Sequence, residues 1–157
     1  MKKILVIEDD QLIRDNILKL LELENFDVVG VEDGYEGILL AKEQIPDLIL
    51  CDVMMPNING YEVLTQLRCN PATETIPFIF ITALADKANL RQGMELGADD
   101  YLFKPFMSDE LLKAITTRLA KQASVQRQAE QKMESLRCKI IRSHYSNYSL
   151  HFSDSQS

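Results

Sequence analysis

The stretch Asp47–Leu64, DLILCDVMMPNINGYEVL, carries the pattern that decides the fold. It begins with the predicted strand Asp47–Cys51, whose residues after the first are apolar without a break. A strand of this kind is covered on both faces, as in a parallel sheet. The helical pattern Val63–Leu67 soon follows, and parallel strands need such a crossover. The stretch therefore predicts one strand-loop-helix unit of a parallel sheet.

The same unit recurs on both sides of this stretch. The predicted strands are Lys3–Glu8, Asp27–Val31, Asp47–Cys51, Pro77–Ile81 and Asp100–Phe103. The apolar patterns of helices are Leu12–Leu21, Ile38–Ala41, Val63–Leu67, Leu90–Leu96 and Leu111–Leu119. The predicted capping residues are Asp10, Asp33, Asp86 and Ser108 at helix starts and Gly97 at a helix end. Five such units predict an α/β fold with an open, doubly wound parallel sheet and helices on both faces.

Charge is distributed unevenly along the 157 residues. Residues 1–120 carry 11 Lys and Arg against 21 Asp and Glu, a net charge of −10. Residues 121–157 carry 6 against 3, a net charge of +3. Nonspecific nucleic-acid binding needs a basic surface that displaces counterions. The acidic body therefore predicts no direct binding to nucleic acid.

Cysteine content and hydropathy point to a cellular location. The three cysteines, Cys51, Cys69 and Cys138, are too few and too scattered for a disulfide framework, and they suit a reducing compartment. No apolar run approaches the roughly 18 residues of a membrane span. We therefore expect a cytoplasmic protein with no membrane partner.

Polar residues stand where the predicted strands end. They are Glu8, Asp9 and Asp10 after the first strand, Asp52 after the third, Thr82 after the fourth and Lys104 after the fifth. Taken singly, each is an ordinary cap, turn or loop residue, and Asp10 suits a cap best. The carboxyl ends of parallel strands meet at one edge of the sheet, where doubly wound folds bind ligands. Their joint placement therefore predicts a functional site.

The chemistry of this edge follows from its charges. Two carboxylates about 4 Å apart repel by roughly 4 kcal/mol at an effective dielectric constant of 20. A cluster of them either takes up protons or holds a hard cation, and Mg²⁺ prefers such oxygen ligands. Lys104 and Thr82 can hold phosphoryl oxygens. Asp52 is then the candidate nucleophile, which forms an acyl phosphate.

Residues 1–120 resemble the receiver domain of two-component response regulators. The matching motifs are KILVIEDD (3–10), LILCDVMMPNINGYEVL (48–64), FIFITALA (78–85) and GADDYLFKPF (97–106). The spacing agrees as well: 43 residues separate Asp9 from Asp52, 30 lead on to Thr82 and 22 more to Lys104. The resemblance implies a flavodoxin-like sheet of five parallel strands in the order 2-1-3-4-5. It also implies a signalling switch rather than an enzyme.

The resemblance implies roles for the acidic residues. Asp52 would be the phosphoacceptor, and Glu8, Asp9 and Asp52 would hold Mg²⁺ together with the backbone carbonyl of Met54. The apolar side chains of Met54 and Leu84 flank the approach of water to the phosphoryl group. We therefore expect slow self-dephosphorylation.

Other roles concern the response. Thr82 and Lys104 would bind the phosphoryl group, Tyr101 would be the switch aromatic, and the Lys104–Pro105 peptide bond would be cis. The implied donor is a sensor histidine kinase or a phosphotransfer protein, and the output would pass to an unknown downstream protein.

Residues 121–143 continue the last helical pattern without an interrupting Pro or Gly. A partial heptad seam runs through Leu112, Ile115, Leu119, Gln122, Gln126, Ala129, Met133, Leu136, Ile140 and Ser143. A coiled coil and a single amphipathic helix both remain open. The seam favours a weak parallel homodimer, which Lys132 and Arg137 would loosen by repulsion.

Residues 144–157 are Ser-rich and predicted to be disordered. His144 and His151 lack the helical setting of a phosphorelay histidine, so we interpret them as tail residues. The segment Met133–Ser143, MESLRCKIIRS, resembles the linker that leads into a histidine-kinase dimerisation helix. An origin as the receiver fragment of a hybrid histidine kinase is therefore one alternative.

Three other functional classes fit the pattern less well. A Mg²⁺-dependent phosphohydrolase with an aspartyl nucleophile usually carries a second Asp two residues later, whereas Met54 follows Asp52 there. A flavin mononucleotide module needs a small, polar loop for its phosphate, which Glu8 and Asp9 would repel. A dimerisation module that has lost signalling would not need Asp52, Thr82 and Lys104, yet the chain contains all three.

Overall fold

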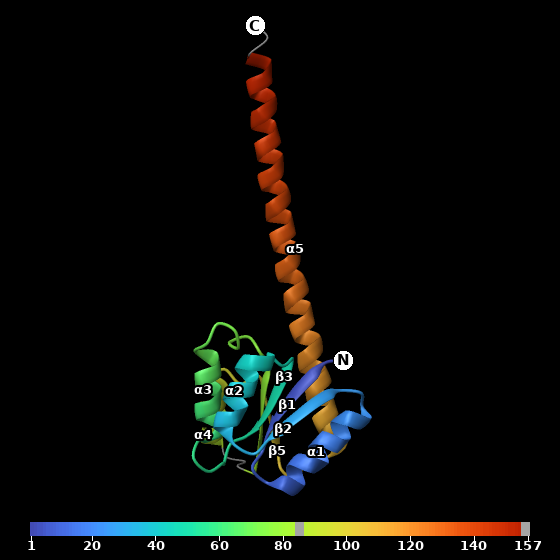
Figure 1. The fold of residues 1–157 in the computed structure, drawn as a ribbon, viewed down its shortest axis with the longest axis vertical. Coiled ribbons are helices and arrows are strands. Elements are labelled where there is room, and N and C mark those ends of the chain that lie inside the picture. The colour runs from blue at the N-terminus through green and yellow to red at the C-terminus, as the bar shows by residue number, and fades with distance from the viewer. Residues whose placement is uncertain (84–86, 155–157) are drawn as a thin grey trace. The chain divides into compact units, whose positions relative to one another are not determined.

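The computed structural model describes residues 1–83 and 87–154, without the side chains of residues 87 and 149–154. Five parallel strands form one sheet in the order β2-β1-β3-β4-β5, as predicted (Figure 1). The strands are β1 (Lys3–Ile7), β2 (Asp27–Val31), β3 (Leu48–Asp52), β4 (Phe78–Thr82) and β5 (Asp100–Phe103). Five strand boundaries differ from prediction. β1 ends at Ile7 rather than Glu8. β3 and β4 each begin and end one residue later, so Asp52 and Thr82 are the last residues of their strands.

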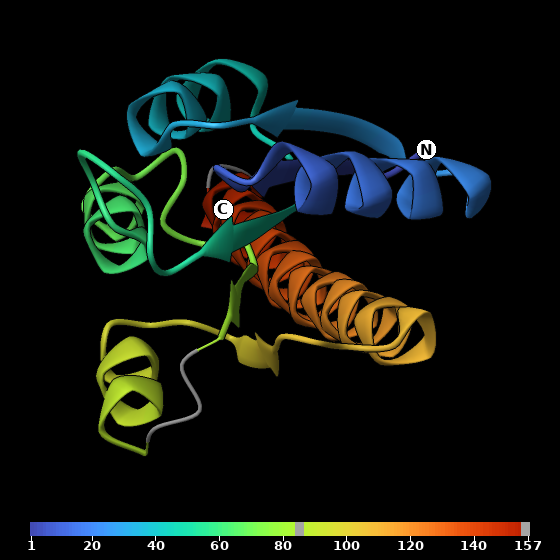
Figure 2. The ribbon, with the colours of Figure 1, turned by 90° about the horizontal axis from the view of Figure 1, so that it is seen from below.

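Helices connect the strands and cover both faces of the sheet. They are α1 (Gln11–Leu23), α2 (Gly34–Gln44), α3 (Gly60–Arg68), α4 (Lys87–Glu95) and α5 (Ser108–Asp154). Figure 2 shows α1 and the first turns of α5 on one face, with α2, α3 and α4 on the other. The predicted doubly wound architecture is thereby confirmed.

Alternation along the strands builds two cores. In β1, Ile4 and Val6 pack with α1 and the start of α5, whereas Leu5 and Ile7 pack with α2 and α3. All four side chains are at most 1% exposed. A strand buried on both faces has no polar alternate positions, which explains its unbroken apolar run.

Local signals at the helix ends agree in part with prediction. The side chain of Asp10 accepts a hydrogen bond from the Ile13 amide, and the side chain of Asp33 accepts one from the Tyr35 amide. Gly97 ends the fourth unit with a φ of 99°, in the left-handed region that glycine tolerates. Ser108 is already the first residue of α5.

The predicted cap Asp86 lies outside the described residues. A start signal that prediction did not use precedes α3, where Asn59 and Glu62 form a reciprocal capping box.

The chain divides into two compact units, Met1–Leu119 and Ala120–Ser157. The second unit is one helix through Asp154, so the prediction of disorder is wrong for residues 144–154. The chain from Ser108 onward contains neither Pro nor Gly, and nothing in it therefore breaks a helix. No helix in the described part of the chain has the length and apolar character needed to cross a membrane.

Candidate functional site

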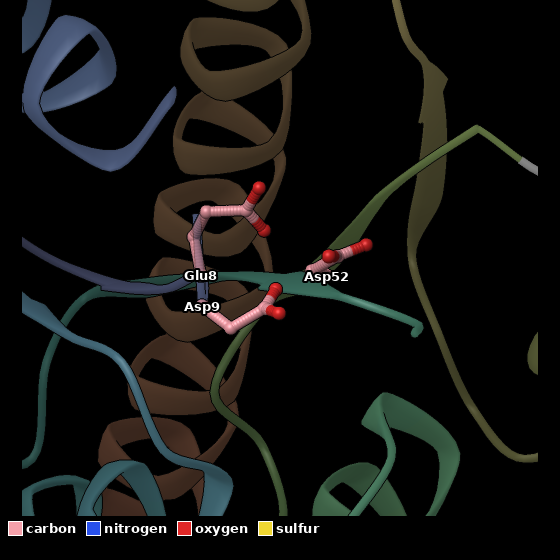
Figure 3. A group of neighbouring side chains, drawn as sticks. All are labelled: Glu8, Asp9 and Asp52. Carbon is pink, nitrogen blue, oxygen red and sulfur yellow. The ribbon is translucent and has the colours of Figure 1, made fainter. Parts of the chain in front are cut away.

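An acidic cluster lies at the carboxyl ends of two neighbouring strands. Glu8 and Asp9 follow β1, and Asp52 ends β3, with Ile7 paired to Cys51 in the parallel register. One carboxylate oxygen from each acidic residue lies within 4.8 Å of the others (Figure 3). The register of the two central strands therefore brings together residues that are 43 positions apart in the sequence.

Burial differs within this cluster. Glu8 is fully buried and Asp52 is 6% exposed, while Asp9 faces solvent. One oxygen of Glu8, Oε2, is buried and accepts no hydrogen bond within the described residues. Buried carboxylates need a hydrogen-bond donor or a cation. The oxygen-rich donor set and the unpaired Oε2 both fit a hard divalent cation such as Mg²⁺.

Lys104 connects the cluster to the last strand. Its Nζ lies 2.6 Å from Oε1 of Glu8 and 3.5 Å from Oδ2 of Asp52. Its backbone amide donates to the carbonyl of Thr82 over 2.8 Å, and its peptide bond to Pro105 is cis, as the resemblance implied. The loop after β5 thus holds one positive charge between two buried carboxylates.

These contacts shift the protonation of all three groups. Burial raises the pKa of Glu8 to about 8, Asp52 adds to this effect and Lys104 opposes it. Burial also raises the pKa of Asp52. Burial alone would lower the pKa of Lys104, but the hydrogen bond to Glu8 and the charge of Asp52 raise it overall. The cluster holds more negative charge than one lysine balances.

The loop after Asp52 folds back tightly against its own strand. The amide of Gly60 donates to the carbonyl of Val53 over 2.9 Å. A Cβ at Gly60 would overlap the backbone carbonyl of Asp52 and press on the ring of Phe80. Gly60 therefore fixes how the chain leaves the site, a role that prediction did not assign. Its position directly after the capping Asn59 is the local signal that was available.

Of the two residues predicted to flank the phosphoryl group, the structure describes one. Met54 is in the loop after β3, and its apolar side chain is 64% exposed. Leu84 lies outside the described residues. Cys51, which precedes Asp52, is fully buried, and its thiol lies 3.2 Å from the carbonyl oxygen of Asp52.

Tyr101, the predicted switch aromatic, points inward and is 8% exposed. Its hydroxyl lies 2.9 Å from the carbonyl oxygen of Asn89 in α4 and 3.1 Å from the hydroxyl of Tyr61 in α3. The Tyr61 hydroxyl donates to the same carbonyl over 3.0 Å. A Cβ at Gly93 would overlap the Tyr101 hydroxyl, so α4 needs glycine there. Sequence patterns did not reveal Tyr61, Asn89 or Gly93, because these contacts join separate elements.

Thr82 is buried at the end of β4, next to the strand that carries Asp52. Its backbone carbonyl accepts from Lys104, so both residues lie at the same edge of the sheet. The structure therefore gathers Glu8, Asp9, Asp52, Thr82 and Lys104 at one edge.

The sequence matches the model of a known domain family and many characterised proteins. Residues 4–116 match the response regulator receiver domain. The chain is 45% identical to the response regulator ArlR of Staphylococcus saprophyticus over 122 residues, which cover 78% of this chain and 54% of ArlR. It is 40% identical over 119 residues to the DNA-binding dual master transcriptional regulator RpaA of Synechocystis, covering 76% of this chain and 49% of RpaA. The chain thus spans about half the length of these relatives.

Solved structures agree with this match. A CheY-like receiver domain protein from Methanospirillum hungatei superposes with a TM-score of 0.75 at 28% identity, covering 79% of this chain and 98% of that one. The receiver domain of sensor histidine kinase PA1611 from Pseudomonas aeruginosa gives a TM-score of 0.71 at 28% identity, covering 76% and 98%. The PA1611 structure has a magnesium ion coordinated in its active-site cleft.

The relatives correct one prediction. RpaA is a DNA-binding regulator, as is the MtrA protein of Mycobacterium tuberculosis, which is 36% identical to this chain over 118 residues. The prediction that direct nucleic-acid binding is not expected is therefore wrong. Net charge over residues 1–120 describes one part of a protein, and an acidic part does not exclude DNA binding by the whole.

Proposed function

Because this chain belongs to the family of response regulator receiver domains, we propose that Asp52 accepts a phosphoryl group from the phosphohistidine of a sensor histidine kinase or phosphotransfer protein. A carboxylate oxygen of Asp52 attacks the phosphorus, a P–O bond forms and the P–N bond of the donor breaks. The imidazole leaves and takes up a proton. The observation that carries the proposal is the position of Asp52 at the end of β3, beside two carboxylates and Lys104.

The acidic residues would hold the metal ion. We propose Glu8, Asp9, Asp52 and the backbone carbonyl of Met54 as ligands of Mg²⁺, which when bound supplies positive charge against the phosphoryl oxygens and the carboxylates. The unpaired Oε2 of Glu8 and the carboxylate oxygens gathered within 4.8 Å support this assignment. Lys104 alone leaves the cluster with excess negative charge.

Lys104 and Thr82 would bind the product. The ammonium of Lys104 already reaches Asp52 at 3.5 Å, so it can contact a phosphoryl oxygen on that residue with little movement. The hydroxyl of Thr82 comes from the adjacent strand and donates to a second oxygen. Lysine acts here as a point charge and threonine as a neutral donor.

The signal would be a change of conformation. Thr82 moves towards the phosphoryl group, and Tyr101 repacks in response, as a local contact that biases a two-state element. Tyr101 is hydrogen-bonded to the backbone of α4, so its movement alters α4 directly. A downstream protein that binds this surface reads the change.

The phosphorylated state would be long-lived. Met54 presents an exposed apolar side chain two residues after the phosphoacceptor. Such a side chain does not position water for attack, so self-dephosphorylation is slow. The protein then signals through its phosphorylated conformation and not through catalytic turnover.

Mass spectrometry tests the phosphoacceptor. Incubation with Mg²⁺ and acetyl phosphate should raise the intact mass by one phosphoryl group, and Asp52→Asn should prevent the increase. The matched control is Asp15→Asn, which removes an exposed carboxylate in α1 and should label like wild type. Chelation of the metal should stop labelling, because transfer onto a carboxylate among carboxylates needs the cation. Equal labelling of Asp52→Asn would refute the assignment.

A further inference from the structure

The second unit, Ala120–Ser157, carries an apolar stripe on its single helix. Met133, Leu136 and Ile140 are 70%, 57% and 69% exposed. Their intervals of three and four residues are those of alternating a and d positions in a heptad. Within the described part of this unit, no second element covers the stripe.

The positions that flank the stripe are mostly basic. With Met133 and Ile140 at a and Leu136 at d, the flanking e and g positions are Glu130, Lys132, Arg137, Lys139 and His144. All five side chains are exposed. Among the described residues, no ion pair joins Lys132, Arg137 or Lys139 to an acidic side chain.

These flanks disfavour a second copy of the chain as the occupant. In a parallel pair, Lys132 would face Arg137 of the second copy. An antiparallel pair with Met133 opposite Leu136 would join Glu130 to Arg137 but also place Lys132 beside Lys139. Like charges at e and g positions oppose pairing, and they decide partner choice in coiled coils.

We propose that the segment Glu130–His144 is a docking surface for an amphipathic helix of another protein, whose apolar seam is flanked by Glu or Asp. Such a helix buries the exposed stripe and gives Lys132, Arg137 and Lys139 opposite charges to face. The segment is 15 residues, or about 22 Å at 1.5 Å per residue, which is two heptads of contact. The assignment is independent of phosphorylation at Asp52.

Two other partners explain only part of the surface. Duplex DNA attracts basic side chains, but its phosphates do not cover an apolar stripe. An anionic membrane would accept both features, but Glu130 and Glu134 line the same surface and would be repelled by anionic headgroups.

Designed peptides test the charge preference. Two labelled peptides of three heptads carry Ile at a and Leu at d; one has Glu at every e and g position and the other has Lys. Fluorescence anisotropy with the full chain should show at least about tenfold tighter binding of the Glu peptide, a preference that added salt reduces. Equal affinity for the two peptides, or no binding of either, would overturn the proposal.

Charge reversal on the chain provides the decisive comparison. The triple variant Lys132→Glu, Arg137→Glu, Lys139→Glu should bind the Lys peptide in preference to the Glu peptide. The matched control, Lys121→Glu, Arg127→Glu, Arg142→Glu, makes the same change of net charge at positions off the seam and should keep the wild-type preference. An inversion of preference cannot arise from misfolding.

Competing occupants are measured on the same samples. Sedimentation of the full chain should show a monomer at the concentrations used for binding. Tight self-association that excludes the Glu peptide, or tighter binding to duplex DNA or to phosphatidylserine vesicles than to that peptide, would assign the surface to that occupant and overturn the proposal.

Discussion

Glu8 shows at the scale of one residue how the site is held ready. Its carboxyl group is fully buried, with one oxygen at 2.6 Å from Lys104 and the other unpaired within the described residues. A buried carboxylate without full compensation is unfavourable, and perturbed groups of this kind gather at functional sites. The raised pKa of Glu8 is the measurable sign of that imbalance. A divalent cation would remove it.

Tyr101 should make stability sensitive to alkaline pH. Burial raises the pKa of its phenol, and the hydrogen bond with Tyr61 adds to the shift. Its contribution is fully present below the unfolded pKa of about 10 and is lost as pH rises above it, because the unfolded phenol ionises first. Urea unfolding between neutral and alkaline pH should show this decline. It should be smaller in Tyr101→Phe.

A tyrosine elsewhere provides the control for that experiment. Tyr35 in α2 is 54% exposed, so Tyr35→Phe should leave the alkaline decline unchanged. If Tyr101→Phe and wild type lose stability in parallel, the hydroxyl of Tyr101 is not held as the structure describes.

The sequence predicted the positions of some site residues but not of others. Glu8, Asp9, Asp52, Thr82 and Lys104 follow predicted strands, and strand ends in a parallel sheet share one edge, so topology alone brings them together. The contact of Tyr61 with Tyr101 has no such basis. It depends on how α3 and α4 pack, which periodicity along one element does not contain.

At the scale of an element, α4 is shaped around Tyr101. Replacing glycine by alanine inside a helix usually stabilises it by about 1 kcal/mol. Gly93→Ala should instead destabilise the protein by about 1–3 kcal/mol, since its Cβ would overlap the Tyr101 side chain and force a rearrangement. Chemical denaturation measures the sign.

A double variant separates overlap from other effects. In the background of Tyr101→Ala, the added Cβ of Gly93→Ala meets no ring, so alanine should regain its ordinary stabilising effect. Destabilisation of equal size in both backgrounds would mean that Tyr101 does not press against α4 at this position.

Element ends were harder to predict than element identities. β3 and β4 end on the polar residues Asp52 and Thr82, although their apolar runs stop one position earlier. Backbone pairing with neighbouring strands continues past the last apolar side chain, as in the pairing of Asp52 with Ile81. For α5, the Ser-rich composition of residues 144–157 led to the prediction that the helix ends before them. The helix continues through Asp154, because the segment contains no Pro or Gly that would break it.

At the scale of the whole molecule, the first unit should act alone. All proposed site residues lie within Met1–Leu119, and the start of α5 supplies Leu111 and Ile115 to its core. A chain of residues 1–120 should therefore fold and accept phosphoryl from acetyl phosphate at a rate within about twofold of the full chain. Intact mass against time measures the rate.

A shorter chain tests the reason. Ending the protein at Met107 removes Leu111 and Ile115, both fully buried, and should abolish cooperative unfolding. Should the chain of residues 1–120 also fail to fold, the second unit would be required for the stability of the first.

The burial of Cys51 makes its thiol a probe of how often the sheet opens. Cys69 and Cys138 are exposed and meet a thiol reagent at once, whereas the Cys51 thiol lies in the central strand with its pKa raised by burial. Its alkylation requires β3 to separate from its neighbours, so the rate of the slow phase of modification reports how often the sheet opens. A ligand that binds the adjacent Asp52 lowers the rate of this slow phase by the factor by which it favours the closed form.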